Sequence, residues 1–274
     1  MEFIFFGTPK FAAIVLEKLI AAGFIPAAVV CNPDRPVGRK QIITSPPTKL
    51  LAQKYNIPVF QPEALSSSKF EILNSKSDFA IVAAYYKIIP KQIIDSFKLG
   101  IIGVHPSLLP KYRGPSPIQT AILAGAEETG TTLFMLDEKI DHGKTIASSK
   151  MQIANSDNFE GLLEKLAELS GELLIKTLPD FVDRKIKPEI QNETKATYTK
   201  KFKTEDGLVD LEKDEPKFIA RKIMALNPEP GVYTFKNGKR LKLLEVEKKD
   251  GALVVIKTQW EGKRPQSDKL DLPL

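Results

Sequence analysis

Short, nearly continuous apolar runs recur through the first two-thirds of the chain and alternate with longer amphipathic stretches. The runs occupy residues 2–6, 25–31, 79–84, 101–105, 131–136 and 145–149. Helical spacing occupies residues 9–22, 48–55, 89–97, 117–124 and 158–182, with Thr8 placed to cap the first helix and Pro9 in its first turn. Apolar strands separated by helices are typical of a parallel sheet covered on both faces. We therefore predict an α/β catalytic domain over residues 1–185, with a Rossmann-like, mostly parallel sheet covered by helices.

The pattern changes after residue 185. Residues 186–205 are polar with little apolar periodicity, which indicates a linker. A short helix then follows Asp214-Glu215-Pro216, and short apolar runs at 231–235, 240–246 and 252–258 predict strands. Asn237-Gly238 is a strong hairpin signal between the first two of these strands. We predict a small β-rich domain over residues 206–274, resembling the oligonucleotide/oligosaccharide-binding (OB) barrel.

Composition adds little that is unusual. Hydrophobic residues make up 42% of the chain and charged residues 27%, as in an ordinary globular protein. The sequence has no apolar run near the roughly 18 residues of a membrane helix, and its start lacks the basic region of a signal peptide. The single cysteine, Cys31, permits no internal disulfide and suits a reducing compartment. We expect a cytoplasmic monomer that does not act at a membrane.

The charge is distributed unevenly. The net charge is +6, but residues 1–194 carry 22 basic and 21 acidic side chains whereas residues 195–274 carry 18 and 13. A basic C-terminal part beside a near-neutral body is typical of a polyanion-binding module. A solvated lysine-rich surface is the alternative interpretation.

Several common chemistries are excluded. A Walker A pattern and a Gly-x-Ser-x-Gly elbow are both absent from the sequence. Gly7-Thr8-Pro9 follows a strand but lacks the later glycines of the dinucleotide fingerprint, which disfavours a nicotinamide or flavin enzyme. Two histidines and one cysteine are too few for a His/Cys metal site, so we expect no metal.

The two histidines indicate a site. His105 ends the fourth predicted strand, and His142 stands beside Asp141 just beyond another strand. Ligands of open parallel sheets bind beyond the carboxyl ends of strands. The loop 106–114 holds two prolines and a glycine, which would stiffen a scaffold with exposed amides. The alternatives are two structural histidines near turns and a rigid strand-to-helix connection.

Seven stretches carry a resemblance to a known family. Phe6-Gly7-Thr8-Pro9, Ser107-Leu108-Leu109-Pro110 with Arg113-Gly114, and Asp141-His142-Gly143 are its most specific parts. Residues 32–39, 84–90, 196–201 and 259–265 add to it. Together these stretches resemble the folate-dependent N-formyltransferases, most closely the members that formylate methionyl-tRNA.

The resemblance implies a function and a set of site residues. The formyl donor would be 10-formyltetrahydrofolate, and the acceptor would be the amino group of initiator methionyl-tRNA in translation initiation. His105 and Asp141 would be catalytic, together with the position of Gly103. The folate would contact Tyr85, Tyr86, Ile88, Ser107, Leu108, Leu109 and Pro110. The tRNA would contact Arg39, Lys40, Lys200 and Lys201.

Three positions depart from the family pattern. The family has Asn-x-His where this chain has Gly103-Val104-His105, a glycine where it has Tyr86, and a threonine where it has His142. Losing one hydrogen-bond donor to a developing oxyanion costs about 10²–10³ in rate in other enzymes. Either the enzyme is slow, or a water molecule, a backbone amide or His142 takes the place of the missing donor. We favour a water molecule in the space beside Gly103, in which case a Gly103→Asn variant keeps or raises activity.

Two other functions remain open. One is a formyltransferase with a small acceptor, either a nucleotide-linked amino sugar or glycinamide ribonucleotide. The polar linker and the basic C-terminal part favour tRNA over both. The other is a non-catalytic folate- or RNA-binding relative, against which the presence of both His105 and Asp141 argues.

Overall fold

The computed structural model describes residues 1–38, 40–65, 77–249 and 252–272. They form two compact units. The first comprises Met1–Arg113, Gly130–Lys150 and Glu164–Thr197, and the second comprises Gly114–Thr129, Met151–Leu163 and Tyr198–Leu274. The boundaries of these units differ from the domain boundaries predicted at residues 185 and 206. Residues 114–129 and 151–163 belong to the unit that contains the C-terminal residues. Residues 186–197 belong to the first unit.

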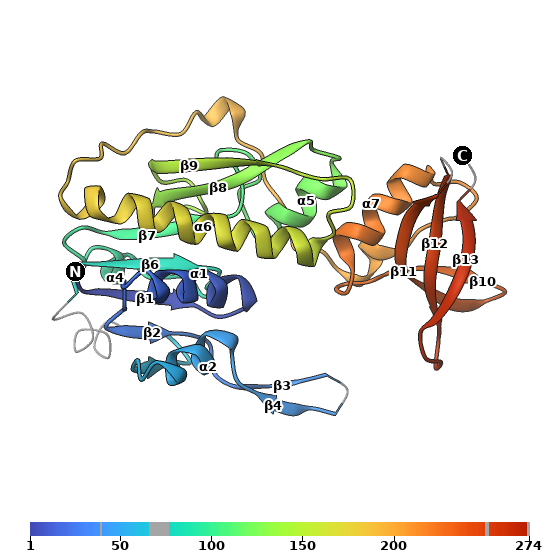
Figure 1. The fold of residues 1–274 in the computed structure, drawn as a ribbon, viewed down its shortest axis with the longest axis horizontal. Coiled ribbons are helices and arrows are strands. Elements are labelled where there is room, and N and C mark those ends of the chain that lie inside the picture. Colours follow the sequence, from blue (N-terminus) through green and yellow to red (C-terminus); the bar gives the residue numbers. More distant parts are fainter. Residues whose placement is uncertain (39, 66–76, 250–251, 273–274) are drawn as a thin grey trace. The chain divides into compact units, whose positions relative to one another are not determined.

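A seven-stranded sheet forms the centre of the first unit, in the order β5-β2-β1-β6-β7-β8-β9 (Figure 1). Its strands are β1 (Phe3–Gly7), β2 (Ala28–Val30), β5 (Val59–Phe60), β6 (Phe79–Ala83), β7 (Ile101–His105), β8 (Glu128–Met135) and β9 (Thr145–Gln152). The pairs from β5 to β7 are parallel, and β8 runs antiparallel to β7. The predicted mostly parallel sheet is confirmed. The two-residue β5 was not predicted.

Apolar side chains fill both sides of the central strands, as their continuous runs require. All five residues of β1 are buried, and the rings of Phe3 and Phe79 stack with their centroids 5.3 Å apart. Helices α1 (Lys10–Ala21) and α6 (Phe159–Val182) lie side by side (Figure 1). Two ion pairs join these helices, Lys10–Glu164 and Lys18–Glu168. The shorter helices of this unit are α2 (Pro47–Lys54), α4 (Lys91–Ile94) and η1 (Glu193–Lys195).

The start of α1 differs from the prediction. Pro9, rather than Thr8, is the N-cap residue, and no side chain caps the helix. The Thr8 hydroxyl instead accepts a hydrogen bond from the Asn32 amide at 3.2 Å. This bond ties the turn after β1 to the end of β2. The prediction was wrong because it considered only neighbours along the chain, whereas the hydroxyl finds its donor 24 residues away.

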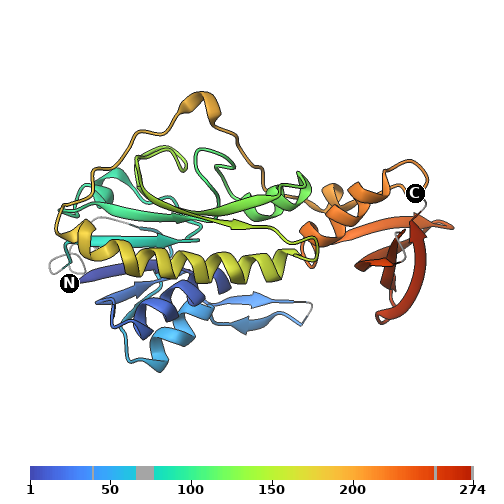
Figure 2. The ribbon, with the colours of Figure 1, turned by 45° about the horizontal axis from the view of Figure 1, so that its top comes forward.

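A two-stranded hairpin extends from this unit between β2 and α2 (Figure 2). It consists of β3 (Arg35–Val37) and β4 (Ile42–Thr44), which the apolar pattern did not predict. The Asp34 carboxylate closes its base by accepting hydrogen bonds from Lys49 at 2.7 Å, Gln61 at 2.8 Å and Ser45 at 2.9 Å. The hydrogen bond from Lys49 is the largest of the effects that lower the pKa of Asp34 to about 2. Because this pKa lies below the ordinary value, the network stabilises the fold above about pH 4 and weakens only as the pH falls toward 2.

Cys31 follows β2 and is buried, and this burial raises the pKa of its thiol to about 11. The thiolate is the reactive form, so we expect the native protein to resist thiol reagents at neutral pH. In a disulfide-exchange assay at pH 7.5, the folded chain should release almost no chromophore in minutes. Its one cysteine should react fully once guanidinium unfolds the chain. Rapid reaction of the folded protein would contradict this placement.

The second unit combines helices with an antiparallel sheet. Its helices are α5 (Pro117–Leu123), η2 (Thr204–Gly207) and α7 (Pro216–Leu226), and its strands are β10 (Val232–Lys236), β11 (Lys239–Lys249), β12 (Ala252–Trp260) and β13 (Gln266–Leu272). Each strand pairs with the next. Asn237 and Gly238 form the tight turn with φ values of 53° and 71°, which confirms the predicted hairpin. The antiparallel C-terminal domain is confirmed, and its likeness to the OB barrel stays a prediction.

Candidate active site

His105 is the last residue of β7, and its side chain is buried at the carboxyl end of the strand. Its Nε2 lies 2.9 Å from the carbonyl oxygen of Tyr112. A carbonyl only accepts, so Nε2 carries the hydrogen of this bond. Its Nδ1 lies 3.5 Å from Oδ2 of Asp141. The ring is therefore held by one loop at Nε2 and faces a carboxylate of another loop at Nδ1.

The two residues that face His105 both have unusual backbone conformations. The φ value of Tyr112 is 61° and that of Asp141 is 49°, which is the left-handed region. Such a conformation costs on the order of 1–3 kcal/mol for a residue other than glycine and persists where its surroundings fix it. Two residues on from Asp141, a Cβ built on Gly143 would lie 1.7 Å from the carbonyl oxygen of Met135. The loop after β8 thus accepts only glycine at this point.

Hydrogen bonds stiffen the loop that follows β7. The Ser107 hydroxyl donates to the carbonyl of Lys111 at 2.6 Å. The Thr132 hydroxyl donates to the carbonyl of Ser107 at 2.7 Å and accepts from the amide of Leu109 at 3.0 Å. This part of the predicted folate set therefore builds a fixed turn beside β8, as the prolines of the loop led us to expect.

The space beside Gly103 is occupied by an aromatic ring. Gly103 pairs with Phe134 across the antiparallel strands β7 and β8, and facing residues of such a pair share one side of the sheet. A Cβ built on Gly103 would lie 2.4 Å from two atoms of the Phe134 ring. The expected water molecule has no room here. That expectation was wrong because it considered the missing side chain without the strand that packs against it.

A polar cluster of Arg113, Gln191 and Glu193 adjoins His105 and Asp141, and the sequence analysis did not foresee it. Arg113 is fully buried and donates two hydrogen bonds to Glu193, at 2.7 and 3.0 Å. It donates two more to Oε1 of Gln191, at 2.8 and 3.2 Å. The hydrogen bond from Arg113 is the main cause that lowers the pKa of Glu193. A buried guanidinium requires such partners, but these stand about 80 residues further along the chain.

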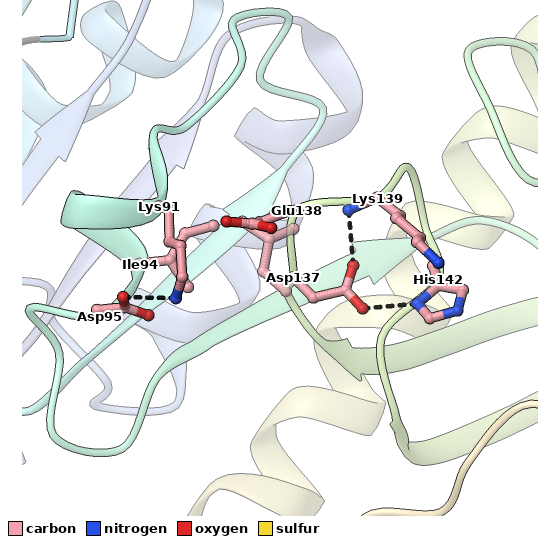
Figure 3. A pocket seen from close by; sticks show the side chains of 8 residues that line it. Lys91, Ile94, Asp95, Asp137, Glu138, Lys139 and His142 are labelled. Atoms are coloured by element: carbon pink, nitrogen blue, oxygen red, sulfur yellow. Dashed lines mark hydrogen bonds and ion pairs between the residues drawn. The ribbon is translucent and has the colours of Figure 1, made fainter.

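A pocket of about 300 Å³ opens between α4 and the loop after β8 (Figure 3). Its lining residues are Lys91, Ile94, Asp95, Leu136, Asp137, Glu138, Lys139 and His142. Asp137 holds Nδ1 of His142 at 2.6 Å and accepts the amide of Lys139 at 2.9 Å (Figure 3). The pocket thus combines apolar walls with paired charges. Of the residues that line the pocket, the sequence analysis had singled out only His142, because the others belong to no motif.

None of the seven predicted folate residues is among those that line this pocket. Tyr85 packs in the hydrophobic core with its ring edge-on to Phe6, and burial raises its pKa to about 12. Its role in packing follows from its place at the end of a buried strand. By contrast, Tyr86 is 70% exposed and Ile88 is 91% exposed. A folate contact by any of the seven residues stays a prediction.

The predicted tRNA contacts fall in both units. Lys40 is exposed next to the tip of the β3–β4 hairpin, and Arg39 lies outside the described residues. Lys200 pairs with Asp206 at 2.5 Å, and its amino group lies 5.9 Å from the centre of the Phe202 ring. Lys201 is exposed. All four contacts stay predictions.

Metal-ligand clusters and membrane-spanning helices are both absent from the described residues. Over residues 1–38, 40–65, 77–249 and 252–272, no three His, Cys, Asp or Glu side chains gather in a way that could hold a metal ion. In the same residues, no helix has the length and apolar character needed to span a bilayer.

The chain matches two family models. Residues 1–178 match the formyl transferase domain, and residues 201–252 match the formyl transferase C-terminal domain. The methionyl-tRNA formyltransferase of Bacillus velezensis is 41% identical over 247 residues, which cover 89% of this chain and 78% of that protein.

Solved structures share the fold at low identity. The methionyl-tRNA formyltransferase from Clostridium thermocellum superposes with a TM-score of 0.66 at 16% identity, over 95% of this chain and 99% of that one. HypX from Aquifex aeolicus in complex with tetrahydrofolic acid gives 0.67 at 18% identity, over 98% of this chain and 45% of that one. This chain thus spans less than half of HypX. With both family models matched in order and the His105–Asp141 pair at the end of β7, the chain belongs to the formyl transferase family.

Proposed function

We propose that the protein transfers the formyl group of 10-formyltetrahydrofolate to the amino group of methionyl-initiator tRNA. The observation that carries the proposal is the approach of His105 and Asp141 at 3.5 Å, at the carboxyl end of a parallel strand. The relative from Bacillus velezensis, at 41% identity, supports the choice of acceptor because its similarity extends over 89% of this chain.

The pocket between α4 and the loop after β8 is our candidate site for the formyl donor. Its volume of about 300 Å³ is at the lower end of the range for small-molecule sites. Ile94 and Leu136 offer apolar contact to a flat ring, while His142 and the neighbouring backbone offer hydrogen bonds. A folate ring with a polar edge matches this chemistry. HypX, a structure of the same fold, was solved in complex with tetrahydrofolic acid, which supports a folate as the donor.

The reaction requires one proton to move between two nitrogen atoms. The acceptor amine attacks the formyl carbon, and the carbonyl electrons move to oxygen. The amine then loses a proton, the leaving nitrogen of the folate gains one, and the carbonyl re-forms as the bond to that nitrogen breaks. His105 can carry this proton at Nδ1, because Tyr112 already occupies Nε2. Asp141 stabilises the imidazolium and so keeps Nδ1 proton-bearing when the oxyanion forms.

The basic C-terminal residues make tRNA the favoured acceptor, since phosphate contacts release counterions. We expect the KM for methionyl-tRNA to rise steeply between 50 and 200 mM salt, by about 10-fold or more. A Lys40→Ala variant should reduce the logarithmic salt slope by about one, whereas Lys98→Ala, a control on an exposed lysine of the first unit, should leave it unchanged. A KM that is flat with salt would count against tRNA.

One experiment separates the candidate functions. The purified chain with 10-formyltetrahydrofolate is offered methionyl-initiator tRNA, an amino-sugar nucleotide and glycinamide ribonucleotide in turn, and the formylated product is measured. Formylation of the tRNA alone supports the proposal. Formylation of only a small amine contradicts the acceptor, and no turnover with any of the three supports a binding protein.

A further inference from the structure

Residues 189–197 lie in the predicted linker, and we name this segment the strap. It contacts two loops: the loop after β7, which contains Tyr112, and the loop after β8, which contains Asp141. It begins with a bridge in which the amides and carbonyls of Glu189 and Thr145 exchange hydrogen bonds of 2.8 Å. It then contains the short helix η1, where Asn192 caps the amide of Thr194 at 3.0 Å. These bonds give the strap a defined course within the first unit.

Gln191 fastens the strap to the loop of Asp141. Its amide nitrogen donates to the carbonyl of Asp141 at 2.9 Å and to the carbonyl of Gly143 at 2.7 Å. The side chain is buried, so water does not compete for these bonds. Gln191 therefore fixes the peptide groups that follow Asp141 and Gly143, and with them the backbone that carries the Asp141 side chain.

Thr197 fastens the other end of the strap to the loop after β7. Its hydroxyl accepts the amide of Tyr112 at 2.8 Å, and its carbonyl accepts the amide of Arg113 at 2.8 Å. Its own amide donates to the carbonyl of Pro110 at 3.2 Å. Three bonds thus fix the backbone around Tyr112, whose carbonyl accepts from Nε2 of His105.

Arg113 connects the two attachments. Its guanidinium donates to Gln191 from one side and to Glu193 from the other. Glu193 also lies 3.7 Å from Nε2 of His142, so the network reaches the residue next to Asp141. Arg113, Gln191 and Glu193 thus connect the loop of Tyr112 with the loop of Asp141 through polar contacts.

We propose that Gln191 and Thr197 are positioning residues that hold Tyr112 and Asp141 in the left-handed conformations needed to orient His105. The role in catalysis rests on the proposed function, whereas the orientation of the ring can be tested without it. A displacement of about 1 Å at a reacting group can cost about 10²-fold in rate. We therefore expect kcat to fall about 10- to 100-fold when either attachment is lost, with the KM for methionyl-tRNA changed less than about twofold.

The test uses two variants that remove the attachments and keep the size of the side chain. Gln191→Met removes both donors to the Asp141 loop, and Thr197→Val removes the acceptor for Tyr112. Thr194→Val is the matched control, because its hydroxyl donates to Asn192 within the strap itself. Thr197 is exposed, so its variant should fold even if the change at buried Gln191 prevents folding.

Nitrogen NMR of the imidazole rings provides a readout that does not need activity. The chain has only two histidines, and a His142→Gln variant assigns the remaining signal to His105. Both strap variants should shift the His105 ring signals, while Thr194→Val leaves them unchanged. Wild-type His105 signals in folded Thr197→Val would overturn the proposal. Shifted signals in a chain that formylates none of the acceptors would support the strap and contradict only the proposed function.

Discussion

Replacing His105 with glutamine is expected to lower kcat with methionyl-tRNA by about 10²–10⁴-fold and to leave its KM nearly unchanged. Glutamine can still donate to the Tyr112 carbonyl, as Nε2 does at 2.9 Å, so the loop after β7 should keep its shape. It cannot bind and release a proton near neutral pH. The loss therefore measures proton transfer rather than folding. Single-turnover formylation with saturating 10-formyltetrahydrofolate is the measurement, since it excludes product release.

Asp141→Asn provides the partner measurement. The amide keeps the size of the carboxylate that lies 3.5 Å from Nδ1, but it no longer stabilises an imidazolium. Because the two groups act on one proton, the double variant should be scarcely slower than His105→Gln alone. Asp183→Asn is the matched control, since its exposed carboxylate pairs with Lys185 and not with a histidine. Activity of His105→Gln within about tenfold of the wild type would contradict a role in proton transfer.

The parts of the fold predicted from the sequence are those where local pattern decides the structure. The continuous apolar runs at β1, β6 and β7 indicated buried parallel strands, and Asn237-Gly238 indicated its hairpin, because both turn residues need positive φ. His105 was placed at a carboxyl strand end by the same argument. The resemblance to a family then paired it with Asp141, a contact that spans 36 positions and that no local pattern contains.

Most of the missed features depend on contacts between distant residues. Gln191 stands in a polar stretch typical of a linker, and only its buried contacts with Arg113 and Gly143 show that the stretch belongs to the site. The hairpin of β3 and β4 has no alternating pattern because its side chains are exposed. The packing of Phe134 against Gly103 depends on the register of two antiparallel strands, which the sequence does not specify.

That packing reverses the prediction for Gly103→Asn. The new Cβ would meet two ring atoms of Phe134 at 2.4 Å, and this ring is buried. Overpacking of this kind costs about 1–3 kcal/mol. We therefore expect the single variant to be destabilised by that amount in urea unfolding and to be less active than the wild type. An unchanged free energy of unfolding would show that the ring moves aside at no cost.

A second change should restore the fit. Phe134→Val shortens the ring to a β-branched side chain that suits strand β8 and makes room for a carboxamide at position 103. Alone it leaves a cavity, at a cost below the roughly 3–5 kcal/mol of a Phe→Ala change. Combined with Gly103→Asn, the two changes should compensate, with a coupling of about 0.5–3 kcal/mol in a double-mutant cycle.

The same pair of variants shows whether the missing carboxamide matters for catalysis. If an amide at position 103 donates to the developing oxyanion, the double variant should exceed the kcat of Phe134→Val by about 10²–10³-fold. A double variant that folds well but gains no activity would contradict this, and would mean that the reacting carbonyl lies away from the face of β7 shared by Gly103 and His105. The two measurements thus report separately on the two consequences of having glycine at position 103. The free energy of unfolding reports on the room that Gly103 gives the ring of Phe134, and kcat reports on its leaving His105 as the side-chain donor from this face of β7.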